Sequence, residues 1–277
     1  MAITAADVKA LREKTGAGMM ECKKALTECN GDSAEAEKYL KEKGLAAVAK
    51  RSERATTEGR LFIRQDGNKI YVVELTCETD FVAKNADFIA LGEKMLDVII
   101  AKGYTSVSDE LKAMMEDLAV KIRENMAVSK VEVIEIPENS VGSFYIHSDK
   151  KTGAVVVISG STSDAVKTFA YDCCLHIAAF TPSYISKKDV PQSYIDEQKE
   201  IFKAQMDQDE KMASKPENVK EGILIGKINK HLAEICFEDQ MFVKDDKKTV
   251  IAKIAEVGKE NGATLKFITA KLFVLGK

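Results

Sequence analysis

The chain has 277 residues, of which 45% are hydrophobic and 31% are charged. It is long enough for one large domain or for two to three smaller ones. The net charge is only −3 at pH 7, with 41 Lys and Arg against 44 Asp and Glu. This balance argues against a protein whose main task is to bind nucleic acid, because such a protein needs a basic face to neutralise phosphates.

Neither a secretory signal nor a membrane span is predicted. The first residues, MAITAADVKALREKTG, contain Asp7 and Glu13 and lack the apolar segment of a signal peptide. No stretch approaches about 18 uninterrupted apolar residues. The six cysteines form no C-x-x-C pair, and Cys173 and Cys174 are adjacent, which suits neither a disulfide framework nor a zinc site. We therefore expect a cytoplasmic protein with reduced thiols and no metal.

Residues 1–54 are predicted to form a small module of three helices. The first helix follows a T-x-x-D capping signal and is broken by TGAG. The second covers MMECKKALTEC, with Met19 and Leu26 expected to face inward. The third covers SAEAEKYLKEKG and is expected to end at Gly44.

Two later segments resemble one another. GRLFIRQDGNKIYVVELT contains the hairpin signal Asp-Gly between two apolar runs. GSFYIHSDKKTGAVVVIS follows at an offset of 83 residues, which aligns Gly59 with Gly142 and Phe62 with Tyr145. We interpret this as an internal duplication of an α+β unit. Chance similarity between two amphipathic hairpins is the alternative.

The region after Pro191 is predicted to form two charged helices separated by a break at Pro216. We interpret them as an antiparallel helical hairpin that protrudes at about 187–235. A final helix precedes a strand, ATLKFITAKLFVL, which could join one of the earlier hairpins. The apolar stripe of the first hairpin helix comprises Tyr194, Ile195, Ile201 and Phe202.

The expected fold class is therefore α+β. It combines the N-terminal three-helix module with a duplicated core of antiparallel sheets and the helical hairpin. The expected domains are residues 1–54, a first core subdomain at 55–140, and a second at 141–277 that contains the hairpin and a C-terminal module.

Motifs for covalent chemistry are missing. There is no G-x-S-x-G, and the three histidines at 147, 176 and 231 lack partners at catalytic or metal-binding spacing. The segment GILIGK has too few residues between its glycines for a phosphate loop. These absences favour a binding protein over an enzyme, with no cofactor and no nucleotide of its own.

Two stretches stand out as candidate binding surfaces. Met19 and Met20 are adjacent in GAGMM and cannot both face the core of so small a module; one buried and one exposed residue is the alternative. Phe81 lies in TDFV at a strand-to-helix turn, either as a core anchor or exposed to a partner. The second copy has Ser163 and Asp164 at this corner, which favours an outward ring.

Two longer motifs resemble a known family. LREKTGAGMMECKKAL (11–26) and ETDFVAKN (78–85) closely resemble the signature stretches of bacterial translation elongation factor Ts. The resemblance covers the whole chain. It implies a ubiquitin-associated-like (UBA-like) N-terminal module, a two-part core and a protruding coiled coil. It also implies guanine-nucleotide exchange in protein biosynthesis, in which elongation factor Tu loses GDP while the exchange factor itself holds no nucleotide.

The resemblance implies roles for individual residues. The TDFV stretch would approach the nucleotide site of elongation factor Tu and disturb its Mg²⁺, with Phe81 wedged between helices of the G domain. His147, which the family places after the second hairpin strand, would contact the same partner. His176 lies in another shared stretch, where packing is an equal alternative. The residues implied in partner binding are Thr79, Asp80, Phe81, Val82, Arg12, Met19, Met20 and His147.

Two questions stay open at this point. Members of the family differ in oligomeric state, so self-association of the chain is neither predicted nor excluded. A non-catalytic scaffold or chaperone-like protein, in which the TDFV corner is purely structural, is the alternative function.

Overall fold

A computed structural model describes residues 3–209, 212 and 215–277. The chain forms two compact units, and each is described by itself. One unit comprises the residues up to Glu135 together with Ser148–Lys151 and Val274–Lys277, and the other comprises Ile136–His147 and Thr152–Phe273. Helices and small antiparallel sheets occur in both, which confirms the α+β class.

The first unit begins with α1 (Ala5–Thr15), α2 (Met19–Glu28) and α3 (Ser33–Ala49). Thr4 and Asp7 form a reciprocal capping box at the start of α1. Gly16, at φ 70°, ends that helix in the left-handed conformation that glycine adopts most easily. A small core holds the three helices together and consists of Val8, Leu11, Cys22, Ala25, Leu26, Cys29, Ala36 and Leu40.

Two expectations for this module are wrong. Met19 does not face inward, because it is the first residue of α2 and its side chain is 45% exposed. The third helix does not end at Gly44 but continues to Ala49. At Gly44 the helix passes close to α6 (Asp109–Ile122), and a Cβ there would lie 2.5 Å from Cγ1 of Val120. Glycine is used here for close approach rather than as a terminator.

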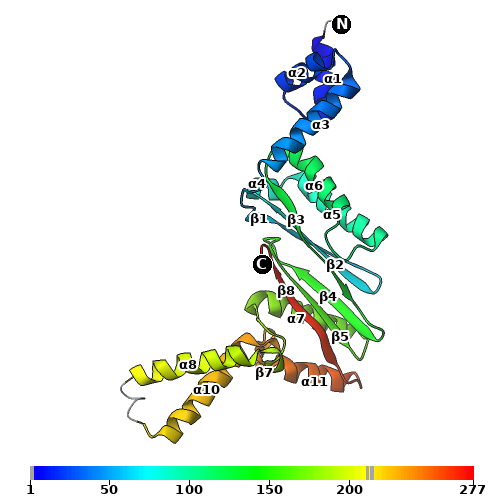
Figure 1. The fold of residues 1–277 in the computed structure, drawn as a ribbon. Coiled ribbons are helices and arrows are strands. Elements are labelled where there is room, and N and C mark those ends of the chain that lie inside the picture. Colours follow the sequence, from blue (N-terminus) through cyan, green and yellow to red (C-terminus); the bar gives the residue numbers. More distant parts are fainter. Residues whose placement is uncertain (1–2, 210–211, 213–214) are drawn as a thin grey trace. The chain divides into compact units, whose positions relative to one another are not determined.

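The three-stranded sheet of the first unit has the order β1-β2-β3. The antiparallel hairpin of β1 (Glu58–Asp66) and β2 (Lys69–Cys77) turns at Gly67 and Asn68, as the Asp-Gly signal predicted. β3 (Met126–Glu135) pairs antiparallel with β2. Figure 1 shows α5 (Ala86–Lys102) and α6 against this sheet. The single turn α4 (Asp80–Ala83) connects β2 to α5.

The sheet of the second unit has the order β4-β5-β8. β4 (Ser140–Ile146) and β5 (Thr152–Ser159) form the second hairpin, and β8 (Lys266–Val274) lies beside β5. The prediction that the last strand joins an earlier hairpin is therefore confirmed. α7 (Asp164–Phe180) packs on β4 and β5 (Figure 1), and α11 (Val250–Glu260) packs on α7. The sequence patterns did not predict the short elements β6 (Met241–Phe242), β7 (Asp245–Thr249), η1 (Lys187–Asp189) and η2 (Phe237–Asp239).

Both units thus carry a hairpin, a following helix and a third strand, but the single offset of 83 residues does not hold for both strands. Gly59 lies opposite Thr76. An offset of 83 would place Gly142 opposite Ser159, yet it lies opposite Val157. The second hairpin has two fewer residues between these paired positions than the first, which shifts its register by two residues and keeps each strand facing the same way.

The helical hairpin consists of α8 (Gln192–Gln208) and α10 (Glu217–Ile235), which pack on each other. Tyr194 of α8 and His231 of α10 are joined by a 2.9 Å hydrogen bond between Oη and Nε2. Ile201 does not belong to the packed stripe, because it is exposed, whereas Tyr194, Ile195 and Phe202 pack in the hairpin core. GILIGK lies within α10, as expected.

Candidate functional site

The TDFV turn, residues Thr79–Val82, carries the most exposed large hydrophobic side chain in the described part of the chain. Phe81 is 82% exposed, whereas the next residue, Val82, is 7% exposed and packs in the core. The exposure expected for Phe81 is therefore confirmed. A phenyl ring in water has no stabilising contact to lose, so it is free to be buried by a partner.

Comparison with the second unit explains why the ring is not needed to close the corner. The hydroxyl of Thr79 accepts a hydrogen bond from the Val82 amide, and the hydroxyl of Ser163 accepts one from the Val166 amide. Aligning these two helix caps places Ala165, not Asp164, at the position of Phe81. Ala165 is also exposed. The sequence alignment was wrong by one residue, but its conclusion holds, because the equivalent corner closes without an aromatic ring.

Thr79 is held from outside its own turn. Its backbone N–H donates to Oε2 of Glu124 at 3.1 Å, and its hydroxyl donates to Oε1 of the same carboxylate at 2.8 Å. In return Oε1 of Glu78 accepts a hydrogen bond of 2.6 Å from the backbone N–H of Asn125. We call these four residues the carboxylate clamp. It joins the end of β2 to the segment between α6 and β3 through two reciprocal carboxylate-to-backbone contacts.

The clamp is also tied to the segment that follows α3. The side-chain amide of Asn125 donates to the carbonyl oxygens of Ser52 at 3.2 Å and Arg54 at 2.6 Å. Asn125 is buried, so these bonds satisfy polar groups that water cannot reach. The hydrogen bond from the Asn125 amide is the main reason why the pKa of Glu78 lies below its ordinary value, with a smaller contribution from the charge of Arg54.

Within the turn, Asp80 and Lys84 form an exposed i,i+4 ion pair with Oδ2 and Nζ 2.6 Å apart. The Cys77 thiol donates to the carbonyl of Thr79 at 3.2 Å. Burial raises the pKa of Cys77 to about 12, so the sulfur keeps its proton and remains a donor. The backbone of the turn is thereby fixed while the ring of Phe81 is left free.

The second candidate surface lies on the N-terminal helices. Met19 and Met20 begin α2 and are 45% and 75% exposed, so both are available to a partner. Arg12 is exposed in the last turn of α1. Glu21 follows the two methionines, and its Oε2 accepts hydrogen bonds from the Gly18 amide at 3.2 Å and from Nη2 of Arg123 at 2.6 Å.

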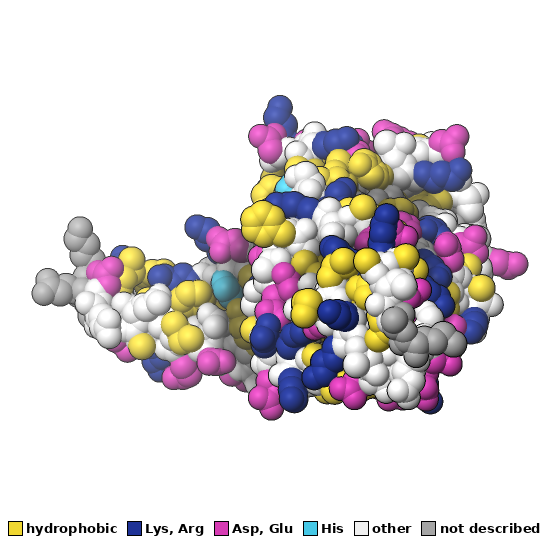
Figure 2. Space-filling model, turned by 90° about the horizontal axis from the view of Figure 1, so that it is seen from above, with side chains coloured by type: hydrophobic (Ala, Val, Ile, Leu, Met, Phe, Trp, Pro, Cys, Tyr) yellow, Lys and Arg dark blue, Asp and Glu magenta, His cyan; other side chains and the backbone are white. Residues whose placement is uncertain are grey.

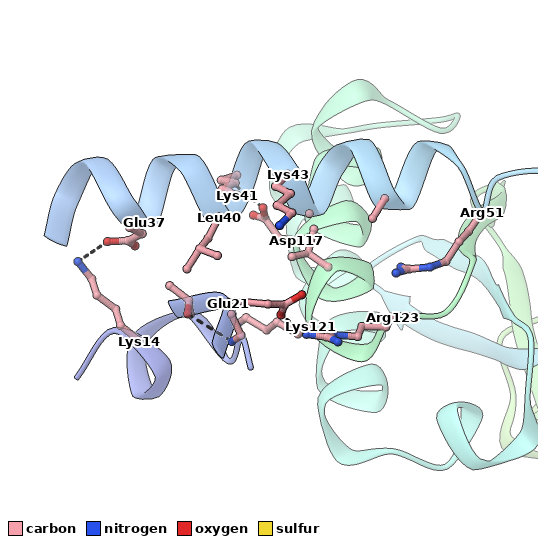
Figure 3. A pocket seen from close by; sticks show the side chains of 15 residues that line it. Lys14, Glu21, Glu37, Leu40, Lys41, Lys43, Arg51, Asp117, Lys121 and Arg123 are labelled. Carbon is pink, nitrogen blue, oxygen red and sulfur yellow. Dashed lines mark hydrogen bonds and ion pairs between the residues drawn. The ribbon is translucent and has the colours of Figure 1, made fainter. Parts of the chain in front are cut away.

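A pocket of about 360 Å³ separates the N-terminal helices from α6 in the first unit. Figure 3 shows Glu21 and Arg123 pointing toward one another at its wall. A second ion pair joins Nζ of Lys41 to Oδ1 of Asp117 at 2.9 Å. Two ion pairs therefore join the N-terminal helices to α6 and its C-terminal end beside this pocket.

The remaining predicted residue, His147, lies in the other unit. The resemblance implied a histidine after the second strand of a hairpin. His147 instead follows β4, the first of the two strands β4 and β5, and it is exposed. Its Nδ1 lies 3.0 Å from Oη of Tyr145. The TDFV turn, Arg12 and the two methionines belong to the first unit, so the structure gives no distance between them and His147.

His176 is a packed residue. It is fully buried, its Nε2 lies 2.9 Å from Oε1 of Gln240, and its Nδ1 accepts a hydrogen bond of 3.1 Å from the Val243 amide. The ring is stacked on Phe180, with centroids 4.7 Å apart. Burial lowers the pKa of His176, and the Val243 amide requires its Nδ1 to be unprotonated, as in the neutral form. Of the two alternatives, the structure favours packing.

Charge is distributed evenly over the face of the molecule that Figure 2 shows, with basic and acidic side chains interspersed. Among the residues that the structure describes, no three His, Cys, Asp or Glu side chains are grouped so that they could hold a metal ion. Within the same residues, no helix combines the length and apolar character required to cross a membrane.

The sequence patterns did not indicate Glu124 and Asn125 as parts of the site. Glu124 lies 45 residues after Thr79, and Asn125 lies 47 residues after Glu78, in the connection between α6 and β3. One signal could have indicated them. A threonine N-cap is often completed by Glu or Gln at the third helical position, which accepts a hydrogen bond from the N-cap amide. That position is Val82, so the Thr79 amide requires an acceptor from elsewhere in the chain.

Comparison with known proteins identifies the family. The family model described as Elongation factor TS matches residues 78–277. Elongation factor Ts of Treponema denticola is 54% identical over 281 residues, covering 100% of this chain and 99% of that protein. The proteins of the same name from Borrelia recurrentis and Borreliella burgdorferi are 42% and 38% identical, covering 94% and 99% of this chain and the same shares of their own. The chain therefore belongs to the elongation factor Ts family and is a nucleotide exchange factor for elongation factor Tu in translation elongation.

Proposed function

We propose that this exchange factor releases GDP by inserting the ring of Phe81 between helices of the G domain of elongation factor Tu. The observation that carries the proposal is the 82% exposure of Phe81 on a turn whose backbone is held by the core. A rigid turn carries the ring to the partner already oriented, so that little binding energy is lost in ordering it.

The physical basis of exchange is a coupling free energy. A factor that weakens the binding of GDP to elongation factor Tu must itself bind less tightly when GDP is present, and by the same factor. Burying one phenyl ring in an apolar crevice gains about 1.5–3 kcal/mol, which corresponds to about tenfold to 100-fold in affinity. The ring therefore supplies part of the coupling, and the wider contact supplies the rest.

Displacement of Mg²⁺ is the proposed consequence. Mg²⁺ requires near-ideal octahedral geometry and is held at nucleotide sites by few protein ligands together with phosphate oxygens. A helix of elongation factor Tu that moves to admit the ring of Phe81 would shift such ligands. The carboxylate of Asp80 is paired with Lys84, so we assign it no role as a competing ligand.

Docking is assigned to the other exposed residues. Arg12, Met19 and Met20 would bind the G domain, since methionine adapts its shape to a partner surface, and His147 would add a contact from the second unit.

We also propose the division into residues 1–54, 55–140 and 141–277, with the hairpin at 187–235. We infer that the chain performs no covalent chemistry, binds neither nucleotide, nucleic acid nor membrane itself, and acts in the cytoplasm. Sedimentation of the pure chain tests for self-association.

The test is stopped-flow release of a fluorescent GDP analogue from elongation factor Tu. Phe81→Ala is expected to slow release by about tenfold or more, because the lost burial energy is about 1.5–3 kcal/mol. Ile268→Ala is the control, since Ile268 is another exposed apolar side chain, on β8. Unchanged release with Phe81→Ala rejects the wedge, and equal losses in the two variants would indicate a general apolar contact instead.

A further inference from the structure

We infer that Glu124 is a positioning residue for nucleotide exchange, which acts by holding the TDFV turn in the conformation that presents Phe81. The inference rests on the proposed function of Phe81. It assigns the task of orienting that ring to a carboxylate that lies 45 residues further along the chain and on a different element.

The TDFV turn cannot hold its own conformation. α4 has four residues, Asp80–Ala83, and a single helical turn is unstable in water without outside contacts. Its own i,i+4 ion pair, between Asp80 and Lys84, is exposed on both sides and such pairs contribute little. The conformation of the turn must therefore come from contacts with the rest of the unit.

Glu124 provides the polar part of those contacts. Its two carboxylate oxygens accept from the backbone N–H and from the hydroxyl of Thr79, at 3.1 and 2.8 Å. The hydroxyl of Thr79 accepts in turn from the Val82 amide at 3.4 Å. The carboxylate thus orients the cap residue, and the cap residue orients the first turn, on which Phe81 lies between Thr79 and Val82.

The apolar contacts of the turn alone leave the direction of the Phe81 ring undetermined. Val82 and Ala83 are buried and anchor the inner side of the turn. Apolar contacts are not directional, whereas two hydrogen bonds that one carboxylate accepts from adjacent donor groups fix an orientation. Glu78 and Asn125 brace the same junction with a third hydrogen bond of 2.6 Å.

The experiment measures nucleotide exchange in the full chain carrying Glu124→Gln. The amide keeps the size of the side chain but places a donor against one of the two donors of Thr79. Loss of a hydrogen bond to a charged acceptor is expected to slow GDP release by about tenfold. Glu116→Gln is the matched control, because Glu116 lies exposed on α6. It is expected to leave exchange unchanged.

Combination with Phe81→Ala separates positioning from general damage. If Glu124 acts through the ring, Glu124→Gln slows exchange in the native background but has little further effect once Phe81 is alanine. Equal slowing in both backgrounds overturns the inference, as does native exchange by a Glu124→Gln variant. If Phe81→Ala itself has no effect, the proposed function fails first.

Substitutions of Thr79 provide the second test, which does not depend on the folding of the Glu124 variant. Thr79→Ser retains both donors and serves as the conservative variant, which is expected to exchange faster than Thr79→Val. Thr79→Val retains the amide but lacks the hydroxyl, and it is expected to lose as much as Glu124→Gln. A Thr79→Val variant with native exchange would overturn the inference.

Discussion

Substitution of Gly92 by alanine should weaken the packing that supports the TDFV turn. Gly92 lies in α5 where the helix crosses the ring of Phe62 on β1. A Cβ at this position would lie 2.2 Å from Cζ of Phe62 and 2.4 Å from both Cε atoms. Carbon atoms in contact are separated by about 3.5–4.0 Å, so the helix and the ring must move apart by about 1 Å or more.

The cost of that movement follows from the burial of the ring. Phe62 is 4% exposed and packs in the core of the first unit, so it has no free space to enter. Overpacking of this kind costs about 1–3 kcal/mol, and the higher helix propensity of alanine returns up to about 1 kcal/mol. Because the approach of 2.2 Å puts this site at the upper end of that range, at about 2–3 kcal/mol, we expect a net loss of about 1–2 kcal/mol. Because α5 begins directly after the turn, at Ala86, exchange activity should also fall.

Gly222 provides the matched control. It also lies within a helix, α10, but nothing lies within 4 Å of a Cβ placed there. Gly222→Ala should therefore stabilise its helix by about 0.5–1 kcal/mol. Amide hydrogen exchange measured in α5 and α10 separately gives the local stabilities, which a single unfolding midpoint of a two-unit chain would not. If Gly92→Ala protects α5 as Gly222→Ala protects α10, the reasoning is refuted.

Three further predictions concern other parts of the chain. Replacing Met19 and Met20 by alanine should weaken binding to elongation factor Tu by about tenfold in calorimetry without lowering the melting temperature, since both are exposed; a lower melting temperature with intact affinity would mark them as core residues. The pKa of His176 is lowered by burial, so its stabilising contribution is present above the ordinary pKa of 6.5 and is lost as pH falls through the lower folded value. Stability measured between pH 7.5 and 5.5 should fall less for His176→Asn, and an identical fall would contradict the assignment. All six cysteines are buried, and the pKa of Cys77 is about 12, so a thiol reagent should label the native chain far more slowly than the unfolded chain; rapid labelling would contradict the packing.

Local patterns predicted most elements of this fold. The helices and strands around the first hairpin followed from apolar periodicity and from turn residues such as Gly67, because these signals act over a few residues. The end of the third helix was misplaced at Gly44, since a glycine that ends a helix and one that admits a neighbouring helix look alike in sequence. The approach of Val120 decides between them, and it comes from a distant element.

One part of the candidate site could be predicted from the sequence and another could not. Exposure of Phe81 could be inferred, because the second copy closes its corner without a ring. The carboxylate clamp could not, because the partners Thr79 and Glu124 are 45 residues apart and pair only when β2 and β3 are neighbours in the sheet. Hairpin register also escaped prediction, since the second hairpin has two fewer residues between equivalent paired positions, and similarity along the sequence does not reveal this.

The central claim is that Phe81 couples binding of this chain to the loss of GDP from elongation factor Tu. The most direct measurement compares the affinity of the chain for nucleotide-free elongation factor Tu with its affinity for the GDP-bound form, in the native chain and in Phe81→Ala. The ratio of the two affinities is the coupling factor. We predict that the ratio falls by about tenfold or more in the variant. An unchanged ratio, with both affinities lowered equally, would contradict the account.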